Sequence, residues 1–130
     1  MRSFLVVFNH GTLLESQIDF IEKSYGIYKN NIIYLNKNLS NLWSNFDPFE
    51  NKVDISSFEQ FILDNSKKGD IVLVQGDFGA TVKLVNFCTS NERVPVYATS
   101  KRESIEEIDD NGDVIKRSIF KFVRFREYRV

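Results

Sequence analysis

The residues best suited to chemistry in this chain are polar side chains that follow a short apolar run near its middle. Residues 71–74 are Ile-Val-Leu-Val, and Gln-Gly-Asp follows directly at 75–77. Four apolar residues in a row indicate a strand buried on both faces, and open α/β sheets bind ligands at the carboxyl ends of such strands. Gly76 and Gly79 would let the backbone turn tightly and approach a ligand. The free N–H groups of a helix that begins near Phe78 would then favour an anion such as phosphate.

A purely structural interpretation of the same segment is open as well. Asp77 is a good N-cap residue, and turns from a strand through a glycine into a helix are common without any ligand. Two further polar clusters follow predicted strands and bear on the choice: Asn9 with His10, and Thr99, Ser100, Lys101 with Arg102. Because carboxyl ends of parallel strands lie at one edge of a sheet, we expect the three clusters to converge on one crevice.

The charged members of these clusters each have two interpretations. Lys101 and Arg102 are candidate phosphate ligands at the mouth of the crevice, or a solvated pair. His10 is the single histidine and is either structural or a functional group beside Asn9. Asp77 beside a phosphate would be unfavourable, so it either caps the helix or accepts a hydrogen bond from a ribose hydroxyl.

Basic residues also fill the last predicted strand, where they alternate with phenylalanines. Strand alternation would place Phe120, Phe122, Arg124 and Arg126 on one face. The two arginines could then clamp a phosphate. Alternatively, they pair with the acids of the sheet or protect a sheet edge by their charge.

Composition limits the classes of protein that the chain can belong to. Its 130 residues suit a single domain, and a net charge of −1 excludes a general nucleic-acid coat held by overall basicity, so no DNA partner is expected. Cys88 lies among apolar residues and is expected to be buried, which leaves no disulfide framework. The apolar run at 4–8 is too short for a signal peptide or membrane span, so we expect a cytoplasmic protein without a membrane partner. With one histidine and one cysteine, no convincing metal site or cofactor is expected.

Strands and helices alternate through the first hundred residues. Strands are expected at 4–8, 31–34, 71–74 and 94–99, and helices are expected from Thr12, Ser56 and Phe78. Thr12 with Glu15 and Ser56 with Glu59 match the capping box of helix N-termini. Asp110-Asn111-Gly112 predicts a hairpin turn between strands at 103–108 and 114–128. The expected fold is α/β, a mostly parallel Rossmann-like sheet flanked by helices with a C-terminal antiparallel hairpin, in one domain over 1–130.

Several longer motifs resemble a known family, the small stand-alone Csx-type CRISPR-associated ring nucleases of type III systems. They are Val6-Val7-Phe8-Asn9-His10, Asn41-Leu42-Trp43, the run from Leu73 to Thr81, Tyr97-Ala98-Thr99-Ser100-Lys101-Arg102, and Val123-Arg124-Phe125-Arg126-Glu127-Tyr128. The resemblance covers nearly the whole chain. It departs after His10, where Gly11 and Thr12 stand in place of an acidic or larger residue.

The resemblance implies a CARF-like subunit that forms a homodimer and binds a cyclic oligoadenylate, cyclic tetra-adenylate above all, across the two-fold axis. It also implies a metal-independent cleavage in which a ribose 2′-hydroxyl attacks the phosphate, which would switch off type III CRISPR antiviral signalling. The same phosphate-binding loop would serve a non-catalytic sponge or sensor. A flavodoxin-like mononucleotide binder is a third possibility.

The candidate residues follow from these clusters and from the resemblance. The candidate catalytic residues are His10, Asp77, Lys101 and Arg102. The candidate ligand-binding residues are Asn9, Gln75, Gly76, Phe78, Gly79, Ala80, Thr81, Thr99, Ser100, Arg124 and Arg126.

Overall fold

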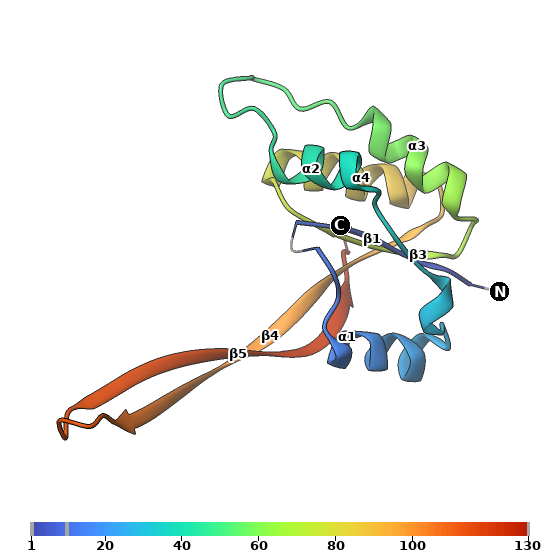
Figure 1. Ribbon diagram of the computed structural model, residues 1–130. Helices are drawn as coiled ribbons and strands as arrows, with labels where there is room; N and C mark the ends of the chain where they lie inside the picture. The colour runs from blue at the N-terminus through green and yellow to red at the C-terminus, as the bar shows by residue number, and fades with distance from the viewer. Residues whose placement is uncertain (1, 10, 130) are drawn as a thin grey trace.

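The fold is built on a five-stranded sheet in the order β2-β1-β3-β4-β5, seen in a computed structural model that describes residues 2–9 and 11–129 (Figure 1). The first four strands along the chain pair in parallel, and the last runs antiparallel to β4. The strands are β1 (Phe4–Phe8), β2 (Ile32–Tyr34), β3 (Ile71–Gln75), β4 (Val94–Ile108) and β5 (Val114–Glu127). The structure thus confirms an α/β, mostly parallel sheet with a C-terminal antiparallel hairpin.

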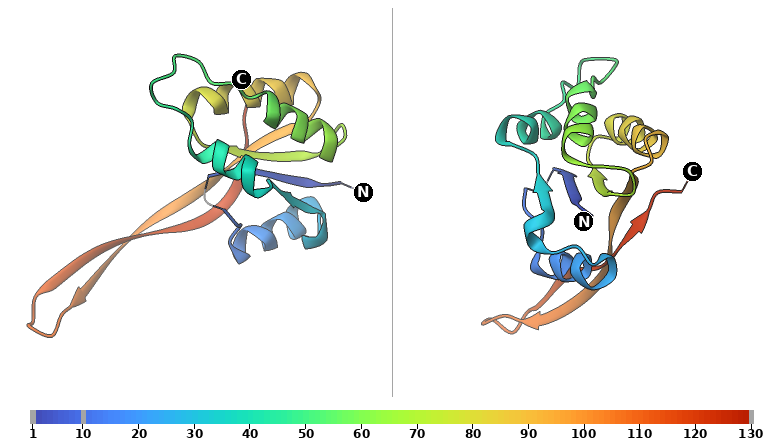
Figure 2. Two further views of the ribbon diagram at one scale, coloured as in Figure 1. Left: turned by 45° about the horizontal axis from the view of Figure 1, so that its top comes forward. Right: turned by 90° about the vertical axis from the view of Figure 1, so that its right-hand side faces the viewer.

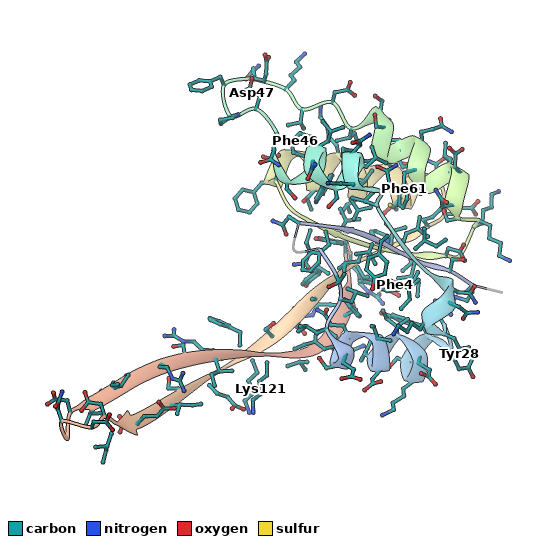
Figure 3. All side chains as sticks on the ribbon, viewed as in Figure 1. Phe4, Tyr28, Phe46, Asp47, Phe61 and Lys121 are labelled. Atoms are coloured by element: carbon teal, nitrogen blue, oxygen red, sulfur yellow. The ribbon has the colours of Figure 1, made fainter. Side chains whose placement is uncertain are left out.

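Helices cover both faces of this sheet (Figures 1 and 2). One face carries α2 (Lys37–Ser44), α3 (Ser56–Asn65) and α4 (Phe78–Ser90), and the other carries α1 (Glu15–Phe20) with the π-helical turn η1 (Ile21–Tyr25). A 3₁₀ turn, η2 (Lys29–Asn31), leads into β2. Phe61 and Phe4, labelled in Figure 3, belong to the two apolar layers on opposite sides of the sheet. Strands buried on both faces explain the continuous apolar runs in β1 and β3.

The strand order creates a topological switch point between β1 and β3. From β1 the chain passes through α1 to β2 on one side, and it returns through α2 and α3 to β3 on the other side of β1. In doubly wound sheets the two connections diverge at such a point, and a crevice opens outside the carboxyl ends of the two strands.

The helix expected from Thr12 begins later than predicted, whereas the helix expected from Ser56 begins at Ser56 but without the predicted capping box. The first helix begins at Glu15, because the Gln17 side chain accepts a hydrogen bond from the Leu14 N–H at 2.8 Å and closes the N-terminus there. At α3 the residue before the helix is Ile55, and the Asp54 carboxylate accepts from the Ser56 N–H at 2.9 Å. In both places a side chain other than the predicted Ser or Thr satisfies the backbone groups that a helix start leaves open.

The hairpin differs from expectation in its length. The predicted strands at 94–99 and 103–108 are one continuous strand, β4, which pairs with β5 as far as Ile108 and Val114. A β-bulge lies where Thr99 pairs with Arg124 and Ser100 with Phe122, so that Val123 has no opposite residue. The hairpin therefore extends well beyond the sheet as a two-stranded arm, defined here as residues 100–122 (Figure 1).

Because of the bulge, the prediction that Phe122 and Arg124 share one face of β5 is wrong. An extra residue shifts the alternation of side chains, and Phe122 packs against Phe125 with ring centroids 4.9 Å apart. Both rings join the apolar layer beneath α1. Phe122 consequently shares its face with Phe125, and not with Arg124 and Arg126 as strict alternation would require.

Candidate functional site

The carboxyl ends of β1, β3 and β4 lie level with one another, as the sequence predicted. Phe8 pairs with Gln75 in the parallel register. Beyond the last register pair of β3 and β4, the Gln75 side-chain oxygen accepts a hydrogen bond from the Ala98 N–H at 2.7 Å. The residues that follow, Asn9, Gly76 and Thr99, therefore meet at one edge of the sheet. His10 lies outside the described residues.

Gln75 joins neighbouring elements at this edge. Its side-chain oxygen extends the pairing between β3 and β4, and its backbone oxygen accepts from the Trp43 indole N–H at 2.8 Å. The amide oxygen is therefore engaged inside the sheet, and the ligand-binding role of Gln75 stays a prediction.

The space beside Gly76 in the direction of a side chain is filled. A Cβ at this position would stand 2.5 Å from Nε1 and 2.9 Å from Cε2 of Trp43, which is fully buried. The indole ring of α2 occupies the space that a side chain would need. The missing side chain of Gly76 therefore serves the packing of Trp43, and the approach of a ligand to its backbone stays a prediction.

Asp77 is the N-cap of α4, which confirms the structural interpretation of this residue. Its carboxylate accepts from the Ala80 N–H at 3.0 Å, and its backbone oxygen accepts from the Thr81 N–H at 2.8 Å. One negative charge therefore already faces the positive end of the helix dipole. No described residue accepts a hydrogen bond from the N–H groups of Phe78 and Gly79. These two donors remain available to an anion, provided that cations offset the carboxylate.

Two lysines that the sequence analysis missed supply such cations. A hollow of about 350 Å³ beside the start of α4 is lined by Lys52 and Lys83, by three carboxylates, Asp47, Glu50 and Asp77, and by Gly79 and most of the rest of the loop 46–53. The two lysines therefore offset part of the negative charge there. The Lys83 ammonium donates to the Val53 backbone oxygen at 2.8 Å and ties this loop to the helix. Figure 3 shows Phe46 and Asp47 on this loop. Lys83 follows Gly79 by one helical turn, and this spacing could have signalled its position.

Phe78 stands out at this helix start because its side chain is 91% exposed. Val82, one turn later, is also exposed and extends the apolar surface along α4. Exposed aromatic rings of this kind provide stacking platforms for nucleobases. Ala80 is fully buried, so its predicted contact with a ligand is wrong. Thr81 carries a buried hydroxyl oxygen for which the described residues offer no partner.

Lys101 and Arg102 stand beyond this edge, on the arm, and point to opposite sides. Lys101 shares its strand face with Thr99 and Tyr97, on the side of the sheet that α4 covers. Arg102 lies on the other face, opposite Phe120, and its Nε donates to the Ser118 hydroxyl at 3.0 Å. Adjacent strand residues always diverge in this way. Of the two cations, Lys101 is on the side of the crevice.

Thr99 and Ser100, the other two residues of the predicted cluster at 99–102, also differ in their surroundings. The Thr99 hydroxyl donates to the Arg124 backbone oxygen at 3.0 Å and fastens β4 to β5 beside the bulge. Ser100 is exposed. Thr99 is therefore held by the sheet, whereas Ser100 is open to solvent.

Arg124 and Arg126 belong to a separate pocket on the edge strand. This pocket, of about 650 Å³, is lined by both arginines and by Tyr25, Tyr97, Phe125, Glu127, Tyr128 and Arg129. Arg126 lies over the Tyr97 ring, 5.6 Å from its centroid, and donates to the Tyr97 hydroxyl at 3.1 Å. Arg124 lies over the Phe20 ring at 5.8 Å. The pocket shares no lining residue with the hollow beside α4, so the two arginines and the lysines of that hollow line different pockets.

Two tyrosines and one cysteine have raised pKa values because their side chains are buried or half-buried. Burial raises the pKa of Tyr128, whose hydroxyl donates to the Val74 backbone oxygen at 2.6 Å. Burial also raises the pKa of Tyr25, against the lowering effect of Arg124. Burial raises the pKa of Cys88 to about 12, and its side chain is fully enclosed beneath α4. Cys88 is therefore an inert packing residue, as predicted.

Within residues 2–9 and 11–129, His, Cys, Asp and Glu form no group of three that could hold a metal ion. Over the same residues, no helix is both long enough and apolar enough to cross a lipid bilayer.

Comparison with known proteins finds relatives over almost the full length of the chain. The sequence model described as the uncharacterized protein MJ1673 family matches residues 2–126. A curated relative, the uncharacterized protein MJ1673 of Methanocaldococcus jannaschii, is 37% identical over 130 residues, which is 98% of each chain. No solved structure matches.

Proposed function

The chain belongs to the uncharacterized protein MJ1673 family, and we propose that it binds a cyclic oligoadenylate at the carboxyl edge of its sheet. The observation that carries this proposal is the composition of the switch point. There, the start of α4 offers free N–H groups and the exposed ring of Phe78. Lys52 and Lys83 line the hollow beside it. A phosphodiester with an adjacent base needs these three kinds of contact.

We assign each contact to named residues. The N–H groups of Phe78 and Gly79 hold a phosphate, and Lys83 and Lys52 offset part of the charge of Asp77, Asp47 and Glu50. The Phe78 ring stacks on an adenine. Lys101 approaches from the arm on the same side of the sheet. Since cyclic tetra-adenylate repeats the same unit around a ring, a two-fold homodimer can offer the same contacts to each half.

We further propose that the ring is opened without a metal ion. The ribose 2′-oxygen forms a bond to the adjacent phosphorus while the bond from phosphorus to the 5′-oxygen breaks. The products are a 2′,3′-cyclic phosphate and a 5′-hydroxyl, so the proton of the 2′-hydroxyl is balanced by the one that the leaving oxygen gains. Lys101 and the helix N–H groups stabilise the developing charge, and His10 is the candidate for proton transfer.

This activity would end type III CRISPR signalling by removing its second messenger. A sequestering protein that leaves the ring intact is the second candidate, and one observation favours it. Asp77 is engaged as the N-cap of α4 and is poorly placed to act as a base. Binding and cleavage are therefore tested separately.

The binding test compares two exposed aromatic residues. Phe78→Ala should weaken binding of cyclic tetra-adenylate by roughly 5- to 150-fold, since loss of base stacking on an aromatic ring corresponds to about 1–3 kcal/mol. Tyr28→Ala is the matched control, because Tyr28 is exposed on the opposite layer, near α1 (Figure 3). Equal affinities for both variants and the wild type would place the ligand elsewhere.

The cleavage test follows the products of cyclic tetra-adenylate chromatographically in the presence of EDTA. Linear products with a cyclic phosphate end would support the ring nuclease. Bound but unchanged ligand after long incubation would assign the protein to sequestration.

A further inference from the structure

The hairpin arm protrudes from the body without a partner. In Figures 1 and 2 its outer part lies away from all the helices. Two-stranded ribbons of this kind are at best marginally stable in water by themselves. Its Phe120 is nevertheless 68% exposed and its Ile108 77% exposed. A long ribbon that displays large apolar side chains requires a surface to pack on.

The two faces of the arm differ in how their charges are satisfied. On the Lys101 face, Lys121 pairs with Glu103 at 3.1 Å and Arg117 pairs with Glu107. Figure 3 shows Lys121 on this arm. That face therefore neutralises most of its own charge.

The opposite face, which we call the serine face, leaves its charges less satisfied. Residues directly opposite in the register share a face, and the serine face is formed by Ser100/Phe122, Arg102/Phe120, Ser104/Ser118, Glu106/Lys116 and Ile108/Val114. Among the residues that the structure describes, Arg102 has only the Ser118 hydroxyl as hydrogen-bond partner, and Glu106 Oε1 is 3.8 Å from Lys116 Nζ. Phe120, Ile108 and Val114 are exposed on the same face. Both its apolar and its charged groups are therefore open to an incoming partner.

The order of residues along the serine face is self-complementary. Ser104 and Ser118 lie midway between the root pair Ser100/Phe122 and the tip pair Ile108/Val114. A two-fold axis through the serines would place Glu106 of one copy at the level of Arg102 of the other. The tip pair Ile108/Val114 would lie at the level of Ser100/Phe122 of the other copy, and Lys116 would lie at the level of its exposed Phe120 ring. Small side chains at the centre allow the two ribbons to approach.

We propose that two copies of this chain pack their arms antiparallel, serine face to serine face, in an isologous dimer. Charge supports this occupant. Acids outnumber bases in the tip half of the arm, where Glu107, Asp109, Asp110 and Asp113 follow Glu106 and the bases are Lys116 and Arg117. The root half carries Lys101, Arg102 and Lys121 against the single acid Glu103. An antiparallel pair brings each acidic tip to a basic root, whereas a parallel pair would bring like charges together. The serine face continues the side of the sheet that α1 covers, whereas the proposed ligand site lies on the α4 side. The arm dimer is therefore a contact separate from the two-fold contact proposed around the ring.

Charge exchange between Glu106 and Arg102 tests this dimer, with oligomeric state measured by analytical ultracentrifugation. Glu106→Arg and Arg102→Glu each place like charges at both symmetric contacts, so each variant alone should raise the dimer dissociation constant at least about tenfold. An equimolar mixture restores attraction at both contacts and should form heterodimers with near wild-type affinity. Glu22→Arg, an exposed position on η1, is the charge control.

Substitutions of exposed phenylalanines test the dimer independently of charge. Phe120→Ser should also dissociate the dimer, whereas Phe49→Ser should not, because Phe49 is 95% exposed on a loop away from the arm. Circular dichroism confirms that each variant is folded. A monomeric wild type, variants that dimerise as tightly as the wild type, or a mixture that stays monomeric would each overturn the proposal. Ligand binding plays no part in this measurement, so its outcome is separate from that of the proposed function.

Discussion

Replacing Gly76 with alanine tests whether this glycine serves packing, as the structure indicates. The new Cβ would stand 2.5 Å from Trp43 Nε1 and 2.9 Å from Cε2. The ring cannot easily withdraw, because its N–H donates to the Gln75 oxygen at 2.8 Å and its other side meets Phe58 at a centroid distance of 4.9 Å. Overpacking a core costs about 1–3 kcal/mol, and a lost neutral hydrogen bond costs about 0.5–1.5 kcal/mol. Together they lower the free energy of unfolding by about 1.5–4.5 kcal/mol.

Gly79→Ala is the matched control for this substitution. Its Cβ would lie 3.5 Å from the Asp77 carboxylate, which is an ordinary contact, and alanine favours a helix by up to about 1 kcal/mol over glycine. Urea unfolding followed by the fluorescence of Trp43, the single tryptophan, measures both variants. We expect Gly76→Ala to be strongly destabilised and Gly79→Ala to match or exceed the wild type. A Gly76→Ala variant with unchanged stability would refute this account of the strand end.

The other predictions concern binding, reactivity and pH. Gly79→Val should reduce affinity for cyclic tetra-adenylate far more than it reduces stability, as calorimetry and urea unfolding can show. Lys101→Ala should lower binding or single-turnover rate roughly 10- to 150-fold, since it removes a charge-assisted hydrogen bond of about 1.5–3 kcal/mol, and a normal rate would count against the crevice. Arg126→Ala should keep turnover within a few-fold. With its pKa raised to about 12, Cys88 should resist iodoacetamide at pH 8 until the protein is unfolded. Because the pKa of Tyr128 is raised in the folded state, only the unfolded phenol ionises just above pH 10.0, so stability should fall there.

Local sequence patterns predicted most of the sheet because they depend on burial alone. The apolar runs of β1 and β3 could only be strands covered on both faces, and the Asp110-Asn111-Gly112 turn located the hairpin. The helix starts were harder, because several residues near each N-terminus can cap it. The N-cap role of Asp77 was one of the roles predicted for it. At the other two helix starts the predicted capping residues, Thr12 and Ser56, do not cap, and Gln17 and Asp54 accept the backbone hydrogen bonds instead.

The site was harder to predict because it depends on contacts between distant parts of the chain. The sequence alone could not reveal that Trp43 fills the space above Gly76, since the two residues meet only through packing of α2 on the sheet. The bulge at Thr99 and Ser100 likewise changed the faces of β5 without a local signal. Lys83 was missed because its role depends on a loop whose course the sequence does not specify.

The most direct test of the central proposal is a calorimetric titration of the wild-type protein with cyclic tetra-adenylate in EDTA. The two-fold arrangement predicts saturable binding with one ring for every two chains, and the switch-point site predicts that Gly79→Val abolishes it. Absence of binding at millimolar ligand, or binding that Gly79→Val leaves unchanged, would contradict the proposed site at the carboxyl edge of the sheet.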